Sequence, residues 1–294
     1  ISGWGNNIFA QSKVYFPKNV TEIKKLIKAK TIARGLGRSY GDSSIQPNST
    51  IITSKLNKIL HFDFKKGILE AEAGISIEAI LKVIVNKGWF LSVTPGSKQI
   101  TLGGMIATNV HGKNHHKVGN FKNQIISFKL VNEKKKLITC SKSLNKKIFN
   151  YTTGGMGLTG IIYSCKFRLK KINSDIILQQ KIKNKNLNET INSIKASNDW
   201  EYNVAWIDTS AQKEQLGRSI LTRGKFSNKK KNKINFNVDN IKKIHIPKFL
   251  LNWFMNKYFI KLFNSLYYNF TNLKEKNTNI ESFFYPLDKI SNWN

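Results

Sequence analysis

The chain has 294 residues, 40% of them hydrophobic, and it carries 49 Lys and Arg against 17 Asp and Glu, for a formal net charge of +32. This length is enough for two domains with substantial cores, and the composition excludes a disordered or fibrous chain. No run of about 18 uncharged apolar residues is present, so we expect no membrane-spanning helix.

Short strands and helices alternate in the first part of the chain. Thr21 is predicted to cap a helix with an apolar face of Ile23, Leu26 and Ile27, and Ser76 to cap a second helix that ends near Gly88. Residues 94–119 are rich in glycine and show little periodicity. We expect strands at 13–16, 31–34, 50–53, 125–131, 137–140 and 161–169, and a hairpin of 61–64 with 68–73.

The character of the sequence changes after Lys171, where glycine becomes sparse. We therefore place a domain boundary near residue 172, with domains at 1–172 and 173–294. In the second domain we expect strands at 176–182, 203–208 and 218–225, a helix at 187–196, and a polar loop at 227–233. The fold class that this order predicts is α+β.

Several glycine loops in the first domain suggest a phosphorylated ligand. Gly35, Gly37 and Gly41 stand beside Arg34 and Arg38, and further small residues follow at 95–96, 101–104 and 108–112. Glycine lets the backbone approach a ligand closely, so that its amides can point at phosphate oxygens. Each loop taken alone is also compatible with a tight connection. The spacing fits neither a P-loop nor a Rossmann fingerprint.

Charge and metal-ligand residues narrow the possible partners. Only five of the basic residues are arginine, and the lysines are scattered through every segment, which disfavours a nucleic-acid surface. His111, His115 and His116 have no acidic or cysteine partner at a ligand spacing, so no metal site is predicted. Cys140 and Cys165 are interpreted as buried free thiols, with one structural bridge as the alternative.

Four strings of residues resemble a known family. They are Ala-Arg-Gly-Leu-Gly-Arg-Ser-Tyr-Gly-Asp (33–42), Pro-Gly-Ser-Lys-Gln-Ile-Thr-Leu-Gly-Gly (95–104), His-Gly-Lys-Asn-His-His (111–116) and Gly-Leu-Thr-Gly-Ile-Ile (157–162). They are similar to the vanillyl-alcohol-oxidase, or PCMH-type, superfamily of FAD-binding oxidoreductases, and most similar to its decaprenylphosphoryl-ribose oxidase family. The resemblance extends to Tyr-Pro-Leu-Asp at 285–288.

The resemblance implies a two-subdomain PCMH-type FAD-binding domain followed by an incomplete α+β substrate domain, with FAD in the cleft between them. Many members attach flavin through the histidine of a Gly-His-Ser turn, whereas the matching turn here is Gly37-Arg38-Ser39, so FAD is expected to be non-covalent. The residues implied to bind FAD are Ala33, Arg34, Gly35, Leu36, Gly37, Arg38, Ser39, Tyr40, Gly41, Asp42, Gly96, Thr101, Leu102, Gly103, Gly104, Thr108, Asn109, Val110, His111 and Ile162.

The implied reaction is oxidation of a secondary alcohol, which requires a base or cation near the reacting oxygen. By resemblance Lys113, His111 and Tyr40 are the candidate catalytic residues. A solvated loop is the alternative for Lys113 and the histidines, and core packing is the alternative for Trp206. The residues implied to bind substrate are Trp206, Asn114 and Tyr285.

The resemblance implies that the substrate is the ribose of a polyprenylphosphoryl-β-D-ribose, oxidised at its 2-hydroxyl, with a short-chain reductase as partner for the second half of an epimerisation that supplies arabinan for the cell envelope. A soluble sugar or alditol, or a non-catalytic basic lipid-binding role, are alternatives. The expected location is peripheral, on the cytoplasmic or periplasmic face of the inner membrane, and no signal peptide is visible. Relatives continue beyond Asn294 and supply a further lysine there, so the chain looks truncated.

Residues 246–270 form an aromatic segment with helical periodicity. One stripe would carry Leu251, Met255, Tyr258, Leu262 and Leu266, and another face Lys257, Lys261 and Asn264. An ordinary core helix is one interpretation. An interfacial lid is the other, because the segment follows lysines at 229–233 and 242–243 that would favour an anionic lipid surface.

Overall fold

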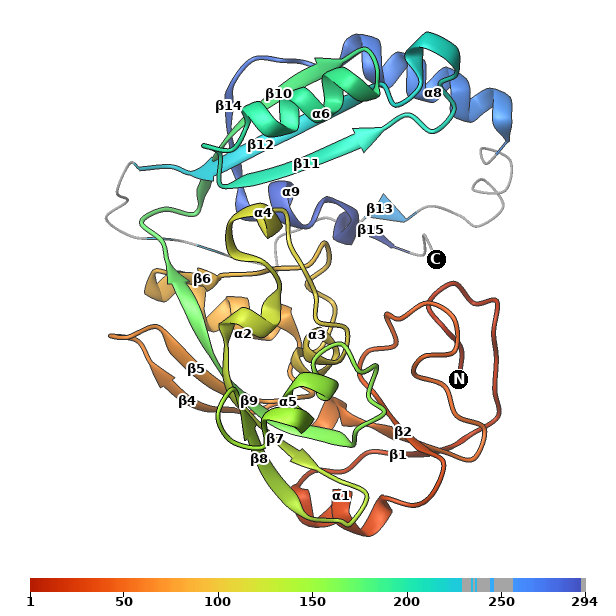
Figure 1. The fold of residues 1–294 in the computed structure, drawn as a ribbon, viewed down its shortest axis with the longest axis vertical. Helices are drawn as coiled ribbons and strands as arrows, with labels where there is room; N and C mark the ends of the chain where they lie inside the picture. Colours follow the sequence, from red (N-terminus) through yellow and green to blue (C-terminus); the bar gives the residue numbers. More distant parts are fainter. Residues whose placement is uncertain (229–233, 235, 237–243, 246–255, 292–294) are drawn as a thin grey trace.

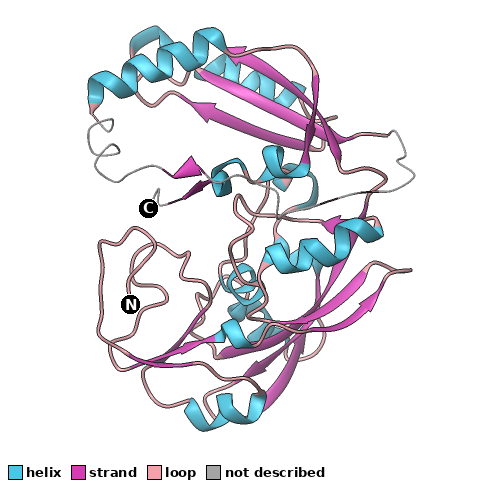
Figure 2. Ribbon diagram, turned by 180° about the vertical axis from the view of Figure 1, so that it is seen from behind, coloured by secondary structure: helices cyan, strands magenta, loops and turns pink. Residues whose placement is uncertain are grey.

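The structure is a computed structural model that describes residues 1–228, 234, 236, 244–245 and 256–291. Two sheet-containing lobes are stacked along the longest axis of the molecule (Figure 1). Figure 2 shows the same two lobes from behind, with the last described part of the chain, residues 280–291, between them.

The first lobe contains two sheets. A parallel sheet with the order β1-β3-β2 is formed by β1 (Lys13–Tyr15), β2 (Thr31–Arg34) and β3 (Ser49–Ile52). A larger antiparallel sheet with the order β4-β5-β9-β7-β8 is formed by β4 (Ile59–Asp63), β5 (Ile68–Glu72), β7 (Ile125–Val131), β8 (Leu137–Ser141) and β9 (Ile161–Lys171), and β6 (Trp89–Leu91) also pairs with β9. The predicted hairpin, β4 with β5, is confirmed.

Helices cover the large sheet and close its core. The helices of this lobe are α1 (Val20–Leu26), α2 (Ile77–Ile84), α3 (Leu102–Ala107), α4 (His115–Val118) and α5 (Lys146–Thr152). In α2 the side chains of Ile77, Ile80, Leu81 and Ile84 are fully buried, in one cluster with Phe167 of β9. Ser76 caps α2 as predicted, and Gly88 ends the following turn with a φ of 80°.

One local prediction is wrong in this lobe, and one stretch contains helices that its sequence pattern did not indicate. Asn19 rather than Thr21 caps α1, because its side chain accepts a hydrogen bond from the Glu22 amide. The stretch 94–119 is not irregular throughout, since Thr101 caps α3 and α4 follows it. Glycine masked the helical pattern of α3, whose buried residues, Leu102, Met105 and Ile106, are held by the sheet behind them. Cys140 and Cys165 are buried free thiols, as predicted.

The second lobe is an antiparallel sheet with a helix on each face: the helix at 187–196 lies in front of the strands in Figure 1, and the helix at 257–270 lies in front of them in Figure 2. Its strands are β10 (Ile176–Asn184), β11 (Tyr202–Ile207), β12 (Ser219–Phe226) and β14 (Lys276–Asn279), in the order β11-β12-β10-β14. Its helices are α6 (Leu187–Ala196) and α8 (Lys257–Phe270), and α6 has the predicted bounds. The predicted polar loop at 227–233 falls mostly outside the described residues.

The chain then returns to the first lobe. Helix α9 (Ile280–Phe284) and the 3-10 turn η5 (Pro286–Lys289) lie between the two sheets, beside the short pair β13 (Ile244–His245) and β15 (Ile290–Ser291) (Figure 1). Phe283, Phe284 and Tyr285 belong to the same buried cluster as α2. Strand β9, the last strand of the first lobe along this part of the chain, ends at Lys171, and β10 of the second lobe begins at Ile176. The predicted boundary near 172 lies in the connection between these two strands.

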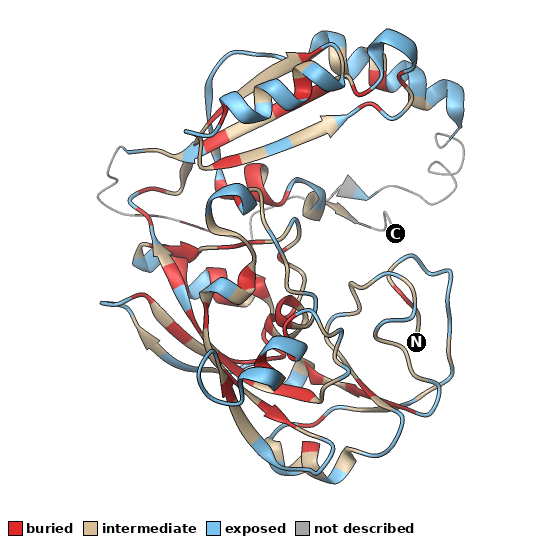
Figure 3. Cartoon of the chain, in the orientation of Figure 1, coloured by how far each residue is buried: buried red, intermediate tan, exposed pale blue. Residues whose placement is uncertain are grey.

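Helix α8 is not a core helix. Tyr258, Leu262 and Leu266 of the predicted stripe are exposed, whereas Asn264, predicted on the polar face, is buried. Asn264 donates to Asp208 at 2.7 Å and anchors the helix to the sheet by a polar contact. Figure 3 shows the helix almost entirely in the colour of exposed residues. Leu251 and Met255 of the stripe, and the lysines at 229–233 and 242–243, lie outside the described residues.

Candidate functional site

The glycine loops of the first lobe converge on one cavity of about 650 Å³. Among the predicted cofactor residues, those that line it are Ala33, Arg34, Gly35, Leu36, Gly37, Arg38, Ser39, Tyr40, Gly96, Thr101, Gly103, Gly104, Thr108, Val110 and Ile162. The others, Gly41, Asp42, Leu102, Asn109 and His111, are not among the lining residues that the structure describes. Three segments far apart in the sequence are thus brought to one site.

The lining also contains residues that sequence reasoning missed. They include Trp4, Ser44, Ser97, Gln99, Met156, Leu287, Asp288 and Ile290. Ser97 and Gln99 adjoin the predicted Gly96 and could have been found from it. Asp288 stands almost two hundred residues further along the chain from this loop, and no local pattern links the two. Only the return of the chain at α9 brings it to the cavity.

Two glycines show how closely the cavity wall is built. A β-carbon at Gly35 would lie 2.3 Å from the Thr101 hydroxyl, which accepts a hydrogen bond from the Gly104 amide at the start of α3. A side chain there would displace the cap of this helix. A β-carbon at Gly96 meets no atom within 4 Å, so this position opens onto free space at the cavity. Gly35 is therefore needed for close packing of the cavity wall, whereas Gly96 leaves room for a ligand.

Positive charge lines the cavity through Arg34 and Arg38. Arg34 donates to the Ser2 carbonyl at 2.7 Å, and Arg38 donates to the side-chain oxygen of Gln99 at 2.9 Å and lies 4.0 Å over the Trp4 ring. Burial lowers the pKa of both guanidinium groups, and Asp288 opposes this for Arg38. Neither forms an ion pair with a carboxylate in the described part of the chain, which leaves charge for an anionic group.

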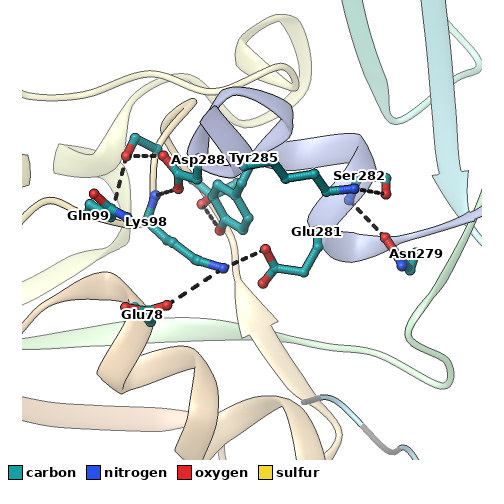
Figure 4. Close-up of polar contacts among 11 residues, drawn as sticks. Glu78, Lys98, Gln99, Asn279, Glu281, Ser282, Tyr285 and Asp288 are labelled. Atoms are coloured by element: carbon teal, nitrogen blue, oxygen red, sulfur yellow. Dashed lines mark hydrogen bonds and ion pairs between the residues drawn. The ribbon is translucent and has the colours of Figure 1, made fainter. Parts of the chain in front are cut away.

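A polar cluster holds the 94–101 loop against α9 and η5 (Figure 4). Asp288 accepts hydrogen bonds from the Ser97 hydroxyl at 2.6 Å and the Lys98 amide at 2.8 Å. The Lys98 ammonium pairs with Glu281 at 2.5 Å and lies 3.7 Å from Glu78. Burial raises the pKa of Glu281, and the ammonium of Lys98 opposes the rise. Gly96, Ser97 and Gln99, which line the cavity, are therefore fixed by a segment from the far end of the chain.

Lys113 lies at the junction of the two lobes rather than on the cavity wall. Its ammonium donates to the Phe283 carbonyl and lies 4.8 Å from the Phe283 ring centre, and its carbonyl accepts from the Asn203 amide at 2.7 Å. Burial lowers the pKa of Lys113 to about 8. The solvated-loop interpretation therefore fails for Lys113.

The other predicted site residues divide between the cavity, the core and the surface. Tyr40 lines the cavity. His111 is exposed, and Asn114 is buried and donates to the Ser92 carbonyl at 2.8 Å. Tyr285 is fully buried with its hydroxyl 2.6 Å from that of Thr94.

Trp206 contacts α8. It is half-buried on β11, with its ring centre 5.0 Å from that of Tyr267. The structure therefore separates Trp206 from the residues that line the cavity, and its role in substrate binding stays a prediction.

Comparison with known proteins shows which family the domain around the cavity resembles. Residues 12–141 match the family described as FAD binding domain, FAD_binding_4. The chain carries a PCMH-type FAD-binding domain. Over 276 residues it is 30% identical to decaprenylphosphoryl-beta-D-ribose oxidase of Mycolicibacterium smegmatis, which covers 90% of this chain and 59% of that protein. It is also 27% identical to L-gulonolactone oxidase of Scyliorhinus torazame over 54% of this chain and 38% of that one.

A solved structure has the same fold. Alkyldihydroxyacetonephosphate synthase matches with a TM-score of 0.60 and 16% identity, over 72% of this chain and 46% of that chain. The chain thus spans 59% of the length of the decaprenylphosphoryl-beta-D-ribose oxidase and 46% of the length of the synthase. The PCMH-type domain and its FAD cofactor agree with the resemblance that the glycine motifs indicate.

The residues of the cavity fit FAD. Its volume lies within the range of about 300–1,000 Å³ typical of cofactor sites. The two arginines complement a pyrophosphate, and the open position at Gly96 allows the backbone close to a ligand. When bound, FAD supplies the acceptor for a hydride.

FAD bound by this domain should be released intact on denaturation. Arginine stands at position 38, and a guanidinium does not form the flavin bond that a histidine makes at this turn. We expect a yellow protein whose acid-precipitated pellet is colourless and whose supernatant contains unmodified FAD by chromatography and mass spectrometry. Flavin that stays with the precipitated chain would contradict this expectation.

Proposed function

We propose that the full protein oxidises the ribose 2-hydroxyl of a polyprenylphosphoryl-β-D-ribose to the 2-keto sugar, with FAD as oxidant. The carrying observation is the cavity of the PCMH-type domain, together with 30% identity to decaprenylphosphoryl-beta-D-ribose oxidase across 90% of this chain. In this reaction the sugar would lose a hydride from C2 and a proton from its hydroxyl, and bound FAD would supply the hydride acceptor. An external electron acceptor would be needed to complete the turnover.

The residues of this chain have distinct roles in the proposal. Lys113 supplies a cation for the oxygen that loses its proton, and Tyr40, which lines the cavity, borders the sugar. His111, Asn114, Trp206 and Tyr285 are proposed as further substrate-side residues. Of these, Asn114 and Tyr285 are buried and would act by holding the loops in place. The keto product requires a reductase of the short-chain class to complete an epimerisation that feeds cell-envelope arabinan.

A soluble substrate is the second candidate. Similarity to L-gulonolactone oxidase and to the D-arabinono-1,4-lactone oxidase of Candida glabrata, at 27% and 25% identity, favours a free sugar derivative. Both candidates oxidise a carbon that carries a hydroxyl group, so they differ only in whether a lipid phosphate is recognised. A basic lipid-binding protein without catalysis is the remaining alternative.

Anaerobic titration of the flavin separates these candidates. The full-length protein is mixed with polyprenylphosphoryl ribose, with L-gulono-1,4-lactone, or with an alditol, and the visible flavin absorbance is recorded. Bleaching by the ribosyl lipid alone supports the proposal. Bleaching by the lactone or the alditol would instead support the second candidate, oxidation of a soluble sugar derivative. If no substrate bleaches a flavin that dithionite reduces, the catalytic proposal is refuted.

We also propose that the protein works at a lipid surface, peripherally on the inner membrane. None of the described helices is long and apolar enough to cross a bilayer. On α8, however, the side chains of Tyr258, Leu262, Phe263, Leu266 and Phe270 are exposed together. Lys257 and Lys261 are exposed on the same helix. Apolar side chains beside lysines are the pattern of an interfacial helix.

The protein should therefore bind vesicles that contain anionic lipid, and less strongly as salt is raised, since each lysine near the surface contributes about 1 kcal/mol. Phe263→Ser with Phe270→Ser should reduce the bound fraction in a sedimentation assay. Phe9→Ser with Phe64→Ser removes two exposed aromatic side chains from the first lobe and should change nothing. Equal binding by parent and α8 variant would refute α8 as the contact. Trp253 and Phe254, two further aromatic residues of the 246–270 segment that would suit the same test, lie outside the described residues.

A further inference from the structure

Residues 276–288 connect the sheet of the second lobe to the cofactor cavity, with no loop between β14 and α9. Strand β14 pairs with β10 and ends at Asn279. The same Asn279 caps α9, because its side chain accepts a hydrogen bond from the Ser282 amide at 2.8 Å. The last residue of strand β14 is thus also the N-cap of α9, the helix that packs against the first lobe (Figure 4). A displacement of this sheet edge must move α9 with it.

Helix α9 is attached to the first lobe by a buried ion pair. Lys98 and Glu281 are 3% and 5% exposed, and their charged atoms are 2.5 Å apart. The other carboxylate oxygen of Glu281 is buried and has no hydrogen-bond partner. A charge in such surroundings is stabilised chiefly by its partner, so removing Lys98 leaves the Glu281 carboxylate buried and unpaired, whereas Lys98 keeps Glu78 at 3.7 Å when Glu281 is removed. The attachment is therefore most sensitive to the loss of Lys98.

The attachment continues to the cavity wall. Asp288 lines the cavity and accepts hydrogen bonds from Ser97 and from the Lys98 amide. The next residue, Gln99, holds the guanidinium of Arg38 through its side-chain and main-chain oxygens, at 2.9 and 3.1 Å. The loop from Gly96 to Gln99 is thus held from both sides of the cavity. If α9 moves, this part of the cavity wall must move with it, and the shape of the proposed FAD site changes.

We propose that residues 279–288 form a strap that couples the second sheet to the FAD site. In this arrangement the Lys98–Glu281 pair and Asp288 are positioning residues for the bound cofactor. The strap makes FAD affinity depend on how the substrate lobe is docked, and FAD binding in turn favours the docked lobe, since coupling between two sites is reciprocal. This inference rests on FAD occupying the cavity.

The test compares FAD dissociation constants of the full-length protein after removal and return of the flavin, measured by quenching of FAD fluorescence. Lys98→Met leaves Glu281 unpaired and should weaken binding by about 10-fold or more, a change of about 1.4 kcal/mol. Lys98→Met with Glu281→Leu replaces the pair by apolar side chains and should restore most of the affinity. Lys129→Met breaks the partly exposed Lys129–Glu70 pair between β7 and β5, far from the 94–101 loop in sequence and absent from the cavity lining, and should leave the affinity unchanged.

A second measurement separates coupling from a general loss of stability. Hydrogen exchange at residues 280–288 should slow when FAD is added to the parent, and this protection should be lost in Lys98→Met while β9 remains protected. If Lys98→Met does not fold, Asp288→Asn supplies the same comparison from the cavity side, with weaker FAD binding expected. Parent-like affinity in the folded single variants, or a double variant as weak as Lys98→Met, would overturn the strap. A parent that never binds FAD would instead refute the cofactor site itself.

Discussion

Replacement of Lys113 by alanine should lower the rate of flavin reduction by roughly 100-fold or more, the scale of losing one preorganised donor to a reacting oxygen. The Lys113 ammonium is half-buried at the junction of the lobes and donates to the Phe283 carbonyl, so the proposed role requires it to exchange this hydrogen bond for one to the substrate oxygen. FAD content should change little, since Lys113 is not among the residues that line the cavity. Stopped-flow reduction of the full-length enzyme by its substrate measures the rate.

The pH dependence of the same rate identifies the charge on Lys113. Burial lowers its pKa from 10.5 to about 8, so the side chain is a cation below pH 8 and neutral above it. If the cation assists the reaction, flavin reduction should slow as pH rises through about 8. Lys113→Arg keeps the charge at every such pH and should remove this inflection. A rate that instead increases above pH 8 would make Lys113 a base.

Stability should respond to pH with the opposite sign. Between pH 8 and 10.5 the unfolded chain holds a proton on Lys113 that the folded chain has released. The free energy of unfolding should therefore rise with pH across this window as far as Lys113 contributes, and Lys113→Ala should remove that contribution. For the reaction itself, the contradicting result is a Lys113→Ala variant that reduces its flavin at the parent rate and still shows the change in flavin-reduction rate near pH 8. That result would exclude Lys113 from the reaction.

Replacement of Gly96 by valine should abolish FAD binding at micromolar flavin, a loss of roughly 100-fold or more in affinity, equivalent to about 2.7 kcal/mol. The Gly96 β-carbon position faces open space at the cavity, so a branched side chain there would occupy space that the cofactor needs. The fold itself should tolerate the change, because no atom lies within 4 Å of that position. Bound flavin per chain and the unfolding temperature of the FAD-free protein are the two readouts.

Gly5→Val is the matched control for this experiment. Gly5 is exposed, is not among the cavity residues, and its β-carbon position meets only a side-chain oxygen of Asn7 at 3.6 Å. It should bind FAD like the parent. If Gly96→Val also keeps parent affinity while folding normally, FAD does not approach this part of the 94–101 loop, and the assignment of Gly96 would be withdrawn.

Local patterns determined the elements whose hydrogen bonds and burial are decided by near neighbours. Helix α6 has the predicted bounds because Asn186 caps it, and the β4-β5 hairpin forms across a short turn that ends in Gly67. The glycine motifs likewise located most of the cavity wall and the family. Glycine at such positions reflects a local constraint on the backbone that is visible without a partner.

Tertiary structure alone decided which distant segments share a site. Asp288 reaches the cavity because β14 leads directly into α9, and Lys113 leaves the cavity wall because its ammonium is held by Phe283. Helix α8 has the periodicity of a core helix, yet its apolar face is exposed because Asn264 attaches the opposite face to Asp208. Periodicity states which side chains share a face of a helix, but only the packing of the chain states whether that face is covered.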